Sequence, residues 1–310
     1  MSAPPTAAPE RPAPERRPVA GALLAAMRPR QWAKNLVLLA PLVFALRATD
    51  PASAARALLG LVAFCLLASA TYLANDLADR EQDRLHPEKR RRPVAAGEIS
   101  SGVAAGASLA LGAAGLALSA LLGWRFLACA AGYLVLQALY TAALKRLAVV
   151  DVFAIAGGFV LRVVAGAEAI DVPISNWLYL CTLLLALFLA LEKRRAELVL
   201  LGGEAADHRG ILSSYTVPLL DQLVTIVAGT TVLAYALYTL APDTVQKFGT
   251  DRLKLTIPFV LFGIFRYLYL VHREGEGGQP ERVLFQDRAT QVNLLAYAGV
   301  VAWAIYTRAP

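Results

Sequence analysis

The chain has 310 residues, of which 57% are hydrophobic and 17% are charged, and its formal net charge is +7. Its mean hydropathy of +0.53 is too high for an ordinary soluble domain of this length, so a soluble globular fold is excluded. A positive net charge can indicate that a protein binds nucleic acid. In so apolar a chain it is better explained by basic cytoplasmic loops and phosphate-bearing substrates, and we expect no nucleic-acid partner.

The chain starts with a segment that is rich in Pro, Ala, Arg and Glu and lacks the apolar core of a secretory signal. We expect residues 1–26 to be a disordered cytoplasmic tail and residues 27–310 to form one transmembrane catalytic domain. A homo-oligomer is compatible with the sequence, but no feature requires one.

Repeated apolar runs of about 18–22 residues predict transmembrane helices. We expect an all-α, polytopic membrane protein whose roughly nine helices form a bundle around a cytoplasm-facing cavity. The expected spans are 32–48, 54–77, 100–122, 125–144, 148–169, 175–198, 214–241, 253–272 and 289–307. Lys and Arg gather in the tail and in alternate loops. By the positive-inside rule, the N-terminus and the active site then face the cytoplasm across the inner (plasma) membrane.

The segment before the first span contains Trp32, Lys34 and Asn35. A Trp and cations at headgroup level are typical of a simple interfacial anchor. Alternatively, Lys34 and Asn35 face the bundle and bind a phosphate group. Pro41 lies within this span and predicts a kink or a tilt.

A row of acidic residues follows the second apolar run. Asp76, Asp79 and Asp83 are three and seven residues apart, so on a helix they share one face, with Asn75 beside them. Carboxylates on one face repel one another unless a cation lies between them, and oxygen ligands suit Mg²⁺. We therefore predict that these four residues bind Mg²⁺ and form the catalytic centre. The alternative is a solvated charged loop between two membrane helices.

A basic loop, 86–93, comes directly after the acidic row, and its Lys89, Arg90 and Arg92 are candidate ligands of phosphate. Carboxylates for a metal next to cations for phosphate are what a magnesium-phosphate site requires.

Three polar positions mark the fourth and fifth spans. Tyr140 and Lys145 end the fourth span and Asp151 opens the fifth, all at the level of the acidic row. Arg162 lies eleven residues further on and returns to about the same helix face as Asp151. An arginine this deep must face the protein interior, where we expect a structural ion pair or a carbonyl partner in preference to a catalytic role.

The sixth span also ends in charged residues, among them Lys193, Arg194 and Glu197. Two halves of the chain that each place charge at the same membrane level indicate one shared cavity. These three residues therefore join the candidate site.

The motif Asn75-Asp76-x-x-Asp79-x-x-x-Asp83, the nine expected spans and the second charged motif resemble the UbiA superfamily of intramembrane prenyltransferases. A narrower likeness is to the branch that transfers phosphoribose to polyprenyl phosphate. It is carried by residues 28–35, 86–93, 158–162, 193–198, 280–284 and 287–288, and by Tyr140 with Lys145. Aromatic prenyltransferases of the superfamily usually carry a second acidic motif after the sixth span, where this chain has cations. That departure favours recognition of a further phosphate over a second metal.

The resemblance implies Mg²⁺-dependent transfer of 5-phosphoribose from phosphoribosyl diphosphate to polyprenyl (decaprenyl) phosphate. Pyrophosphate would be released, in the synthesis of an arabinan cell-wall precursor. The expected substrate-binding residues are Lys34, Asn35, Lys89, Arg90, Arg92, Tyr140, Lys145, Asp151, Arg162, Lys193, Arg194 and Glu197. Two alternatives stay open. An isoprenyl transferase with a small aromatic acceptor would need two acidic motifs, and a transporter or lipid flippase would cluster its polar residues near mid-membrane.

Overall fold

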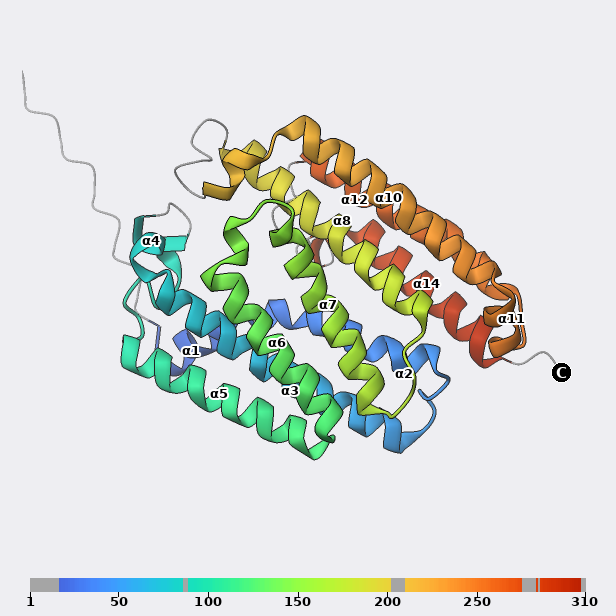
Figure 1. Cartoon of the computed structure of the whole chain (residues 1–310), viewed down its shortest axis with the longest axis horizontal. Coiled ribbons are helices and arrows are strands. Elements are labelled where there is room, and N and C mark those ends of the chain that lie inside the picture. Colours follow the sequence, from blue (N-terminus) through green and yellow to red (C-terminus); the bar gives the residue numbers. More distant parts are fainter. Residues whose placement is uncertain (1–16, 86–88, 202–209, 275–282, 284, 308–310) are drawn as a thin grey trace, which may run out of the picture.

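The computed structural model describes residues 17–85, 89–201, 210–274, 283 and 285–307. Within these ranges every regular element is a helix (Figure 1). The all-α architecture expected from the apolar runs is thereby confirmed.

Eight helices in the described ranges are long and apolar enough to cross a membrane. They are α3 (Pro51–Ala78), α5 (Ser101–Leu121), α6 (Trp124–Ala142), α7 (Val150–Ala169), α8 (Asn176–Leu201), α10 (Val217–Leu240), α12 (Ile257–Glu274) together with η6 (Arg252–Thr256), and α14 (Arg288–Tyr306). The chain is therefore a multi-pass membrane protein. The first expected span, 32–48, is the one without a counterpart among these eight helices.

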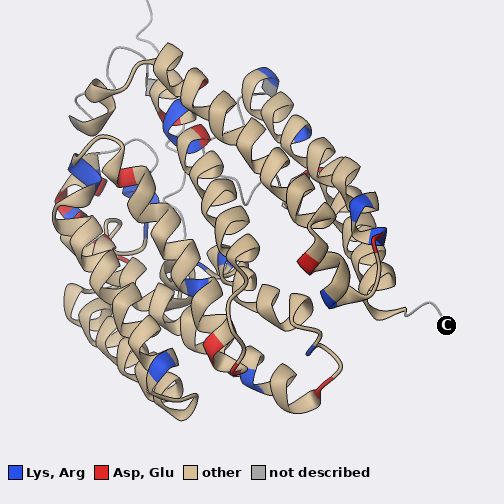
Figure 2. Cartoon of the chain, turned by 45° about the vertical axis from the view of Figure 1, so that its right-hand side comes forward, with Lys and Arg blue, Asp and Glu red and all other residues tan. Residues whose placement is uncertain are grey.

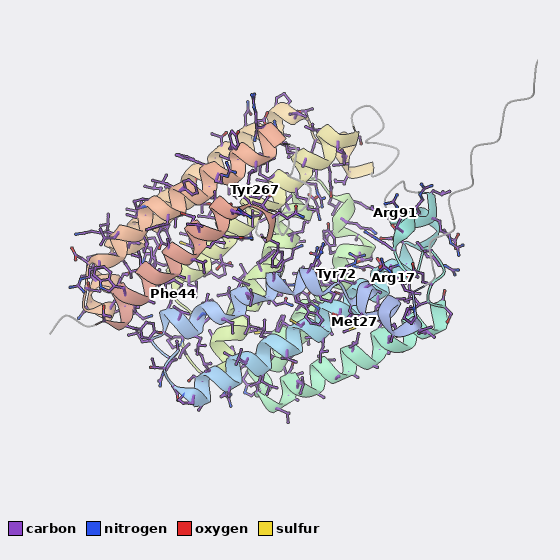
Figure 3. All side chains as sticks on the ribbon, turned by 180° about the vertical axis from the view of Figure 1, so that it is seen from behind. Arg17, Met27, Phe44, Tyr72, Arg91 and Tyr267 are labelled. Carbon is purple, nitrogen blue, oxygen red and sulfur yellow. The ribbon has the colours of Figure 1, made fainter. Side chains whose placement is uncertain are left out.

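That segment forms a 3-10 helix, η1 (Pro29–Leu39), followed by the short α2 (Ala40–Phe44). Pro41 has no N–H to donate to the preceding turn, and the Ala40 amide bonds to the Val37 carbonyl, three residues back. A 3-10 helix rises about 2.0 Å per residue, so η1 and α2 together reach about 30 Å, the thickness of a bilayer core. Figure 3 shows this blue ribbon running between the N-terminal and C-terminal helices, with Phe44 at one end.

Part of the expected disordered tail is also helical. Helix α1 (Val19–Met27) follows Pro18, and Ala22 and Ala26 are buried in a cluster with Leu73 of α3. Alanine and leucine are strong helix formers, and the small alanine side chains let α1 approach α3 closely. The expectation of disorder is therefore wrong for residues 19–26, and residues 1–16 lie outside the described ranges.

The helices form two halves, one from η1 to α7 and one from α8 to α14 (Figure 1). The core of the first half is centred on Phe64, whose ring lies 5.8 Å from that of Phe126. The core of the second half includes Phe188, 5.5 Å from Tyr267. Helices α7 and α8 pack against each other and connect the two halves.

The bundle has two distinct ends. The end with α4 (Arg80–Leu85), η2 (Lys89–Arg91) and η3 (Leu144–Arg146) is here called the charged end. The end with α11 (Pro242–Phe248) is called the far end. At the far end the halves meet, because Phe44 packs edge-on against Tyr238 and Tyr306 donates to the Val43 carbonyl. Charged residues gather at both ends, with long uncharged stretches between them (Figure 2).

Candidate active site

A cavity of about 2520 Å³ lies between the two halves and is lined by residues from the charged end to the far end. At the charged end its wall carries carboxylates from α3, α4 and α8 and cations from η1, η2, η3 and α8. Deeper, the wall is mainly aromatic and aliphatic, for example Phe159, Phe188 and Leu189. The cavity can thus hold a highly charged group at one end and an apolar chain below it.

The acidic row lines the charged end, although α3 stops within it. Asp79 is the C-cap of α3, and Asp83 lies on α4. The Asp79 amide still bonds to the Asn75 carbonyl at 2.9 Å, and the Asp83 amide to the Asp79 carbonyl at 2.8 Å. These helical bonds carry the chain across the break, so Asn75, Asp76, Asp79 and Asp83 all face the cavity.

Arginines surround the two buried acids of the row, Asp76 and Asp83. Asp76 is 1% exposed and accepts from Arg28 at 2.5 Å and from Arg92 at 3.1 Å. The same Arg92 nitrogen donates to Asp83 at 2.7 Å. Arg28 takes a left-handed backbone, φ 55°, and its guanidinium lies over the Tyr72 ring. Burial lowers the pKa of Arg28, while Asp76 beside it acts in the opposite direction.

The fit of a divalent cation to this row can be tested on Asp76. Its Oδ2 is buried and has no hydrogen-bond partner among the described residues, which is costly for a carboxylate oxygen. In the same described ranges, no three His, Cys, Asp or Glu side chains stand close enough to form a ready metal cluster. The donor set is all oxygen and suits Mg²⁺, with Asp76, Asp79, Asp83 and the Asn75 amide as its candidate ligands.

The two cations of the basic loop that line the cavity are Lys89 and Arg92. A 3-10 turn has about three residues per turn, so positions three apart share a face, and the Arg92 amide bonds to the Lys89 carbonyl at 2.9 Å. Arg90 lies between them, is exposed and is not part of the cavity wall. Arg90 therefore does not line the cavity in this arrangement, and its part in substrate binding stays a prediction. Lys145 extends from η3 and reaches Asp79 at 3.3 Å.

Arg162 lies deep in the cavity wall and is 5% exposed. Its guanidinium donates to the Asn35 side chain at 2.7 Å, to the Gly158 carbonyl at 2.7 Å and to the Tyr133 hydroxyl at 3.0 Å. These are neutral oxygens, in agreement with a carbonyl partner. Asn35 is fully buried behind the wall and orients Arg162; it does not line the cavity itself.

Arg194 is held in a polar network at the charged end of α8. It donates to Asp151 at 2.6 Å, to Glu197 at 2.6 Å and to the Tyr140 hydroxyl at 2.9 Å. Arg194 is 1% exposed and Asp151 is fully buried, and Asp151 lies behind the cavity wall. With two carboxylates on its guanidinium, Arg194 is better placed to orient Tyr140 than to neutralise a substrate.

The structure thus brings most of the predicted residues into one cavity wall. Those that line it are Lys34, Asn75, Asp76, Asp79, Asp83, Lys89, Arg92, Tyr140, Lys145, Arg162, Lys193, Arg194 and Glu197. Asn35 and Asp151 support it from behind, and Arg90 lies outside it.

Sequence reasoning missed one residue of the cavity wall, Arg28, and one residue that supports the site from behind, Tyr215. Arg28 reads as a membrane anchor in the sequence, and only the fold brings it to Asp76. Tyr215 lies in the link between η5 (Gly210–Ser214) and α10, donates to Asp151 and has no neighbouring motif that would single it out.

Comparison with known proteins finds relatives that cover most of the chain. The profile of the UbiA prenyltransferase family matches residues 36–286. The decaprenyl-phosphate phosphoribosyltransferase of Mycolicibacterium smegmatis is 36% identical over 293 residues, which are 92% of each chain. The enzyme of the same name from Corynebacterium glutamicum is 37% identical over 294 residues, 93% of this chain and 88% of the relative.

Among solved structures, a UbiA homologue from Archaeoglobus fulgidus bound to GPP and Mg²⁺ is similar, with a TM-score of 0.68. The match covers 92% of this chain and 97% of that protein at 21% sequence identity. At this level of identity the likeness speaks for the fold alone.

Proposed function

The chain belongs to the UbiA prenyltransferase family and is a transferase, and we propose that it moves 5-phosphoribose from phosphoribosyl diphosphate to polyprenyl (decaprenyl) phosphate. The names of its relatives support this donor and this acceptor. We place the reaction in the supply of an arabinan cell-wall precursor. The charged end of the cavity is taken as cytoplasmic, because the basic loops lie there.

The observation that carries the proposal is the distribution of charge around the cavity. The row of carboxylates is supplied by α3 and α4, whereas the corresponding end of α8 contributes Lys193 together with Arg194 and Glu197, which pair with each other. Phosphoribosyl diphosphate carries a 5-phosphate and a diphosphate, and polyprenyl phosphate carries a further phosphate. Binding all three groups requires many cations and one row of metal ligands. An isoprenyl donor with a neutral aromatic acceptor needs fewer cations.

Each wall has a part in the proposed reaction. Mg²⁺ bound at the acidic row would neutralise the diphosphate as it leaves. Lys89 and Arg92 bind the phosphate oxygens of the donor, and Lys34, Lys145 and Tyr140 orient the phosphate of the lipid acceptor. The apolar part of the wall, which includes Phe159 and Phe188, takes the polyprenyl chain.

The chemistry needs little proton transfer. An oxygen of the acceptor phosphate attacks C1 of the ribose while the bond from C1 to the diphosphate oxygen breaks, and pyrophosphate departs with that electron pair. The acceptor is already an anion at pH 7, so no general base is required. Positioning and charge neutralisation then account for most of the rate.

The test uses the purified protein in lipid nanodiscs with labelled phosphoribosyl diphosphate and polyprenyl phosphate, with and without Mg²⁺. Pyrophosphate and a labelled lipid should appear only when both substrates and the cation are present. Consumption of an isoprenyl diphosphate with an aromatic acceptor would replace the proposal with the prenyltransferase alternative. Lipid translocation without any new bond would favour the flippase alternative.

A further inference from the structure

The turn that carries Lys145 ends in an unusual backbone conformation. It connects α6 to α7 and contains η3, and Val149 at its end has φ 68° and ψ −43°. A positive φ is rare for a β-branched residue, and this region, close to that of a γ-turn, is strained. Such a conformation persists only where surrounding contacts hold it.

One side chain from the other half of the bundle supplies those contacts. The hydroxyl of Tyr215 accepts a hydrogen bond from the Val149 amide at 2.7 Å and donates one to Asp151 at 2.7 Å. Asp151 is fully buried, and its second oxygen accepts from Arg194 at 2.6 Å. The hydroxyl of Tyr215 therefore connects the Val149 backbone to the Arg194 network.

Tyr215 itself is 3% exposed and is not part of the cavity wall, so it touches no substrate in the cavity. Burial, and then its bond to Asp151, raises the pKa of Tyr215 to about 12. The hydroxyl consequently keeps its proton at neutral pH and remains a donor to Asp151 while it accepts from Val149.

We propose that Tyr215 is a positioning residue for the transfer reaction: its hydroxyl holds the strained Val149 backbone and thereby keeps Lys145 opposite Asp79. The role of Lys145 toward the acceptor phosphate rests on the proposed function, whereas the restraint on the turn does not. Tyr215 also joins the hydrophobic core of the second half. A purely structural role would depend on its ring, and the proposed role depends on its hydroxyl.

Proteolysis tests the restraint without any activity measurement. Arg146 is exposed on this turn, so trypsin cleavage after Lys145 and Arg146 reports how often the turn opens. Tyr215→Phe keeps the ring and should speed this cleavage by up to about tenfold, the upper end of the effect of removing one neutral hydrogen bond. The matched control is Tyr306→Phe, which removes a hydroxyl bond at the far end and should leave cleavage at these two sites unchanged. Equal rates in Tyr215→Phe and wild type would overturn the proposal.

A double-mutant cycle separates the restraint on Val149 from the bond to Asp151. Glycine adopts positive φ at little cost, so in a Val149→Gly background Tyr215→Phe should change the cleavage rate less than about threefold. The same tenfold change in both backgrounds would show that the hydroxyl acts through its bond to Asp151 and not through Val149, and would overturn the proposal.

Kinetics tests the consequence for the site. Tyr215→Phe should raise KM for polyprenyl phosphate about tenfold with a smaller change in kcat, and should add nothing to Lys145→Ala. An additive effect in the double variant, or an effect on kcat alone, contradicts the positioning role. If wild-type protein transfers no phosphoribose, the proposed function fails, while the proteolysis result still decides whether Tyr215 restrains the turn.

Discussion

Arg28 and Asp76 form an ion pair of 2.5 Å although they lie 48 positions apart in the chain. The pair fixes the start of η1 against the end of α3, at the edge of the cavity. It also places a protein cation on the acid that heads the proposed metal site. Under the proposed function, Arg28 and a divalent cation would neutralise the same buried carboxylate.

Replacing Arg28 tests this shared neutralisation. Arg28→Ala leaves the charge of Asp76 with one cation fewer. Because Arg28 is 27% exposed, we expect the free energy of unfolding to fall by about 1–3 kcal/mol. Mg²⁺ should restore part of that loss, so the cation should raise Tm more in Arg28→Ala than in wild type. Thermal unfolding in detergent with Mg²⁺ or with a chelator measures this, and an identical Mg²⁺ increment in both proteins contradicts it.

Substitutions in the acidic row should separate catalysis from stability. Asp79 is 33% exposed and pairs with Lys145, whereas Asp76 is buried with two arginines. Asp79→Asn should lower Mg²⁺-dependent turnover at least about 100-fold with little change in Tm, since exposed ion pairs stabilise weakly. Asp76→Asn should lower both turnover and Tm.

The control for both variants is Asp221→Asn. Asp221 pairs with Arg195 and does not line the main cavity, so this change should leave turnover close to that of wild type. Near-wild-type turnover of Asp79→Asn would remove this acid from the proposed metal site.

Local spacing was enough to predict the acidic row, because Asp76, Asp79 and Asp83 recur at helical intervals directly after an apolar run. Eight of the nine expected spans were predictable because a bilayer demands long apolar helices, and the exception is 32–48. The sequence predicts that the basic loop contributes cations to the site, but the turn decides which of these cations face the cavity. A 3-10 turn sends Arg90 outward, and charge density along the sequence does not reveal that.

Long-range pairings stayed out of reach for a different reason. In the sequence, Arg28 cannot be distinguished from other arginines near a membrane surface. Tyr215 likewise cannot be distinguished from other tyrosines near the start of a helix. Their roles depend on partners in other helices, which no periodicity encodes. The 3-10 form of η1 was likewise hidden, because it follows from close packing against α7 as well as from Pro41.

That packing has its own test at Gly166. A Cβ added there would lie 1.9 Å from the Leu38 carbonyl oxygen, a backbone atom that cannot move without shifting η1. Gly166→Ala should therefore destabilise the fold by about 2 kcal/mol or more. Gly106→Ala in α5 is the control: a Cβ there meets nothing within 4 Å, and alanine favours the helix. Equal Tm values for the two variants would contradict the close contact of α7 with η1.

Asp287 connects the start of α14 to α12 and should make stability depend on pH. Two hydrogen bonds from Arg266 hold the pKa of Asp287 well below its usual range, and Thr290 adds two more. A carboxylate whose pKa is lowered on folding contributes stability above its unfolded pKa of about 4 and loses it as the pH falls further. Asp287→Asn keeps a side chain that can cap α14 but removes the charge, so it should cost about 1–2 kcal/mol at pH 7. The Tm difference from wild type should narrow below about pH 4, and a difference that stays constant down to about pH 3 would show that the ion pair does not contribute.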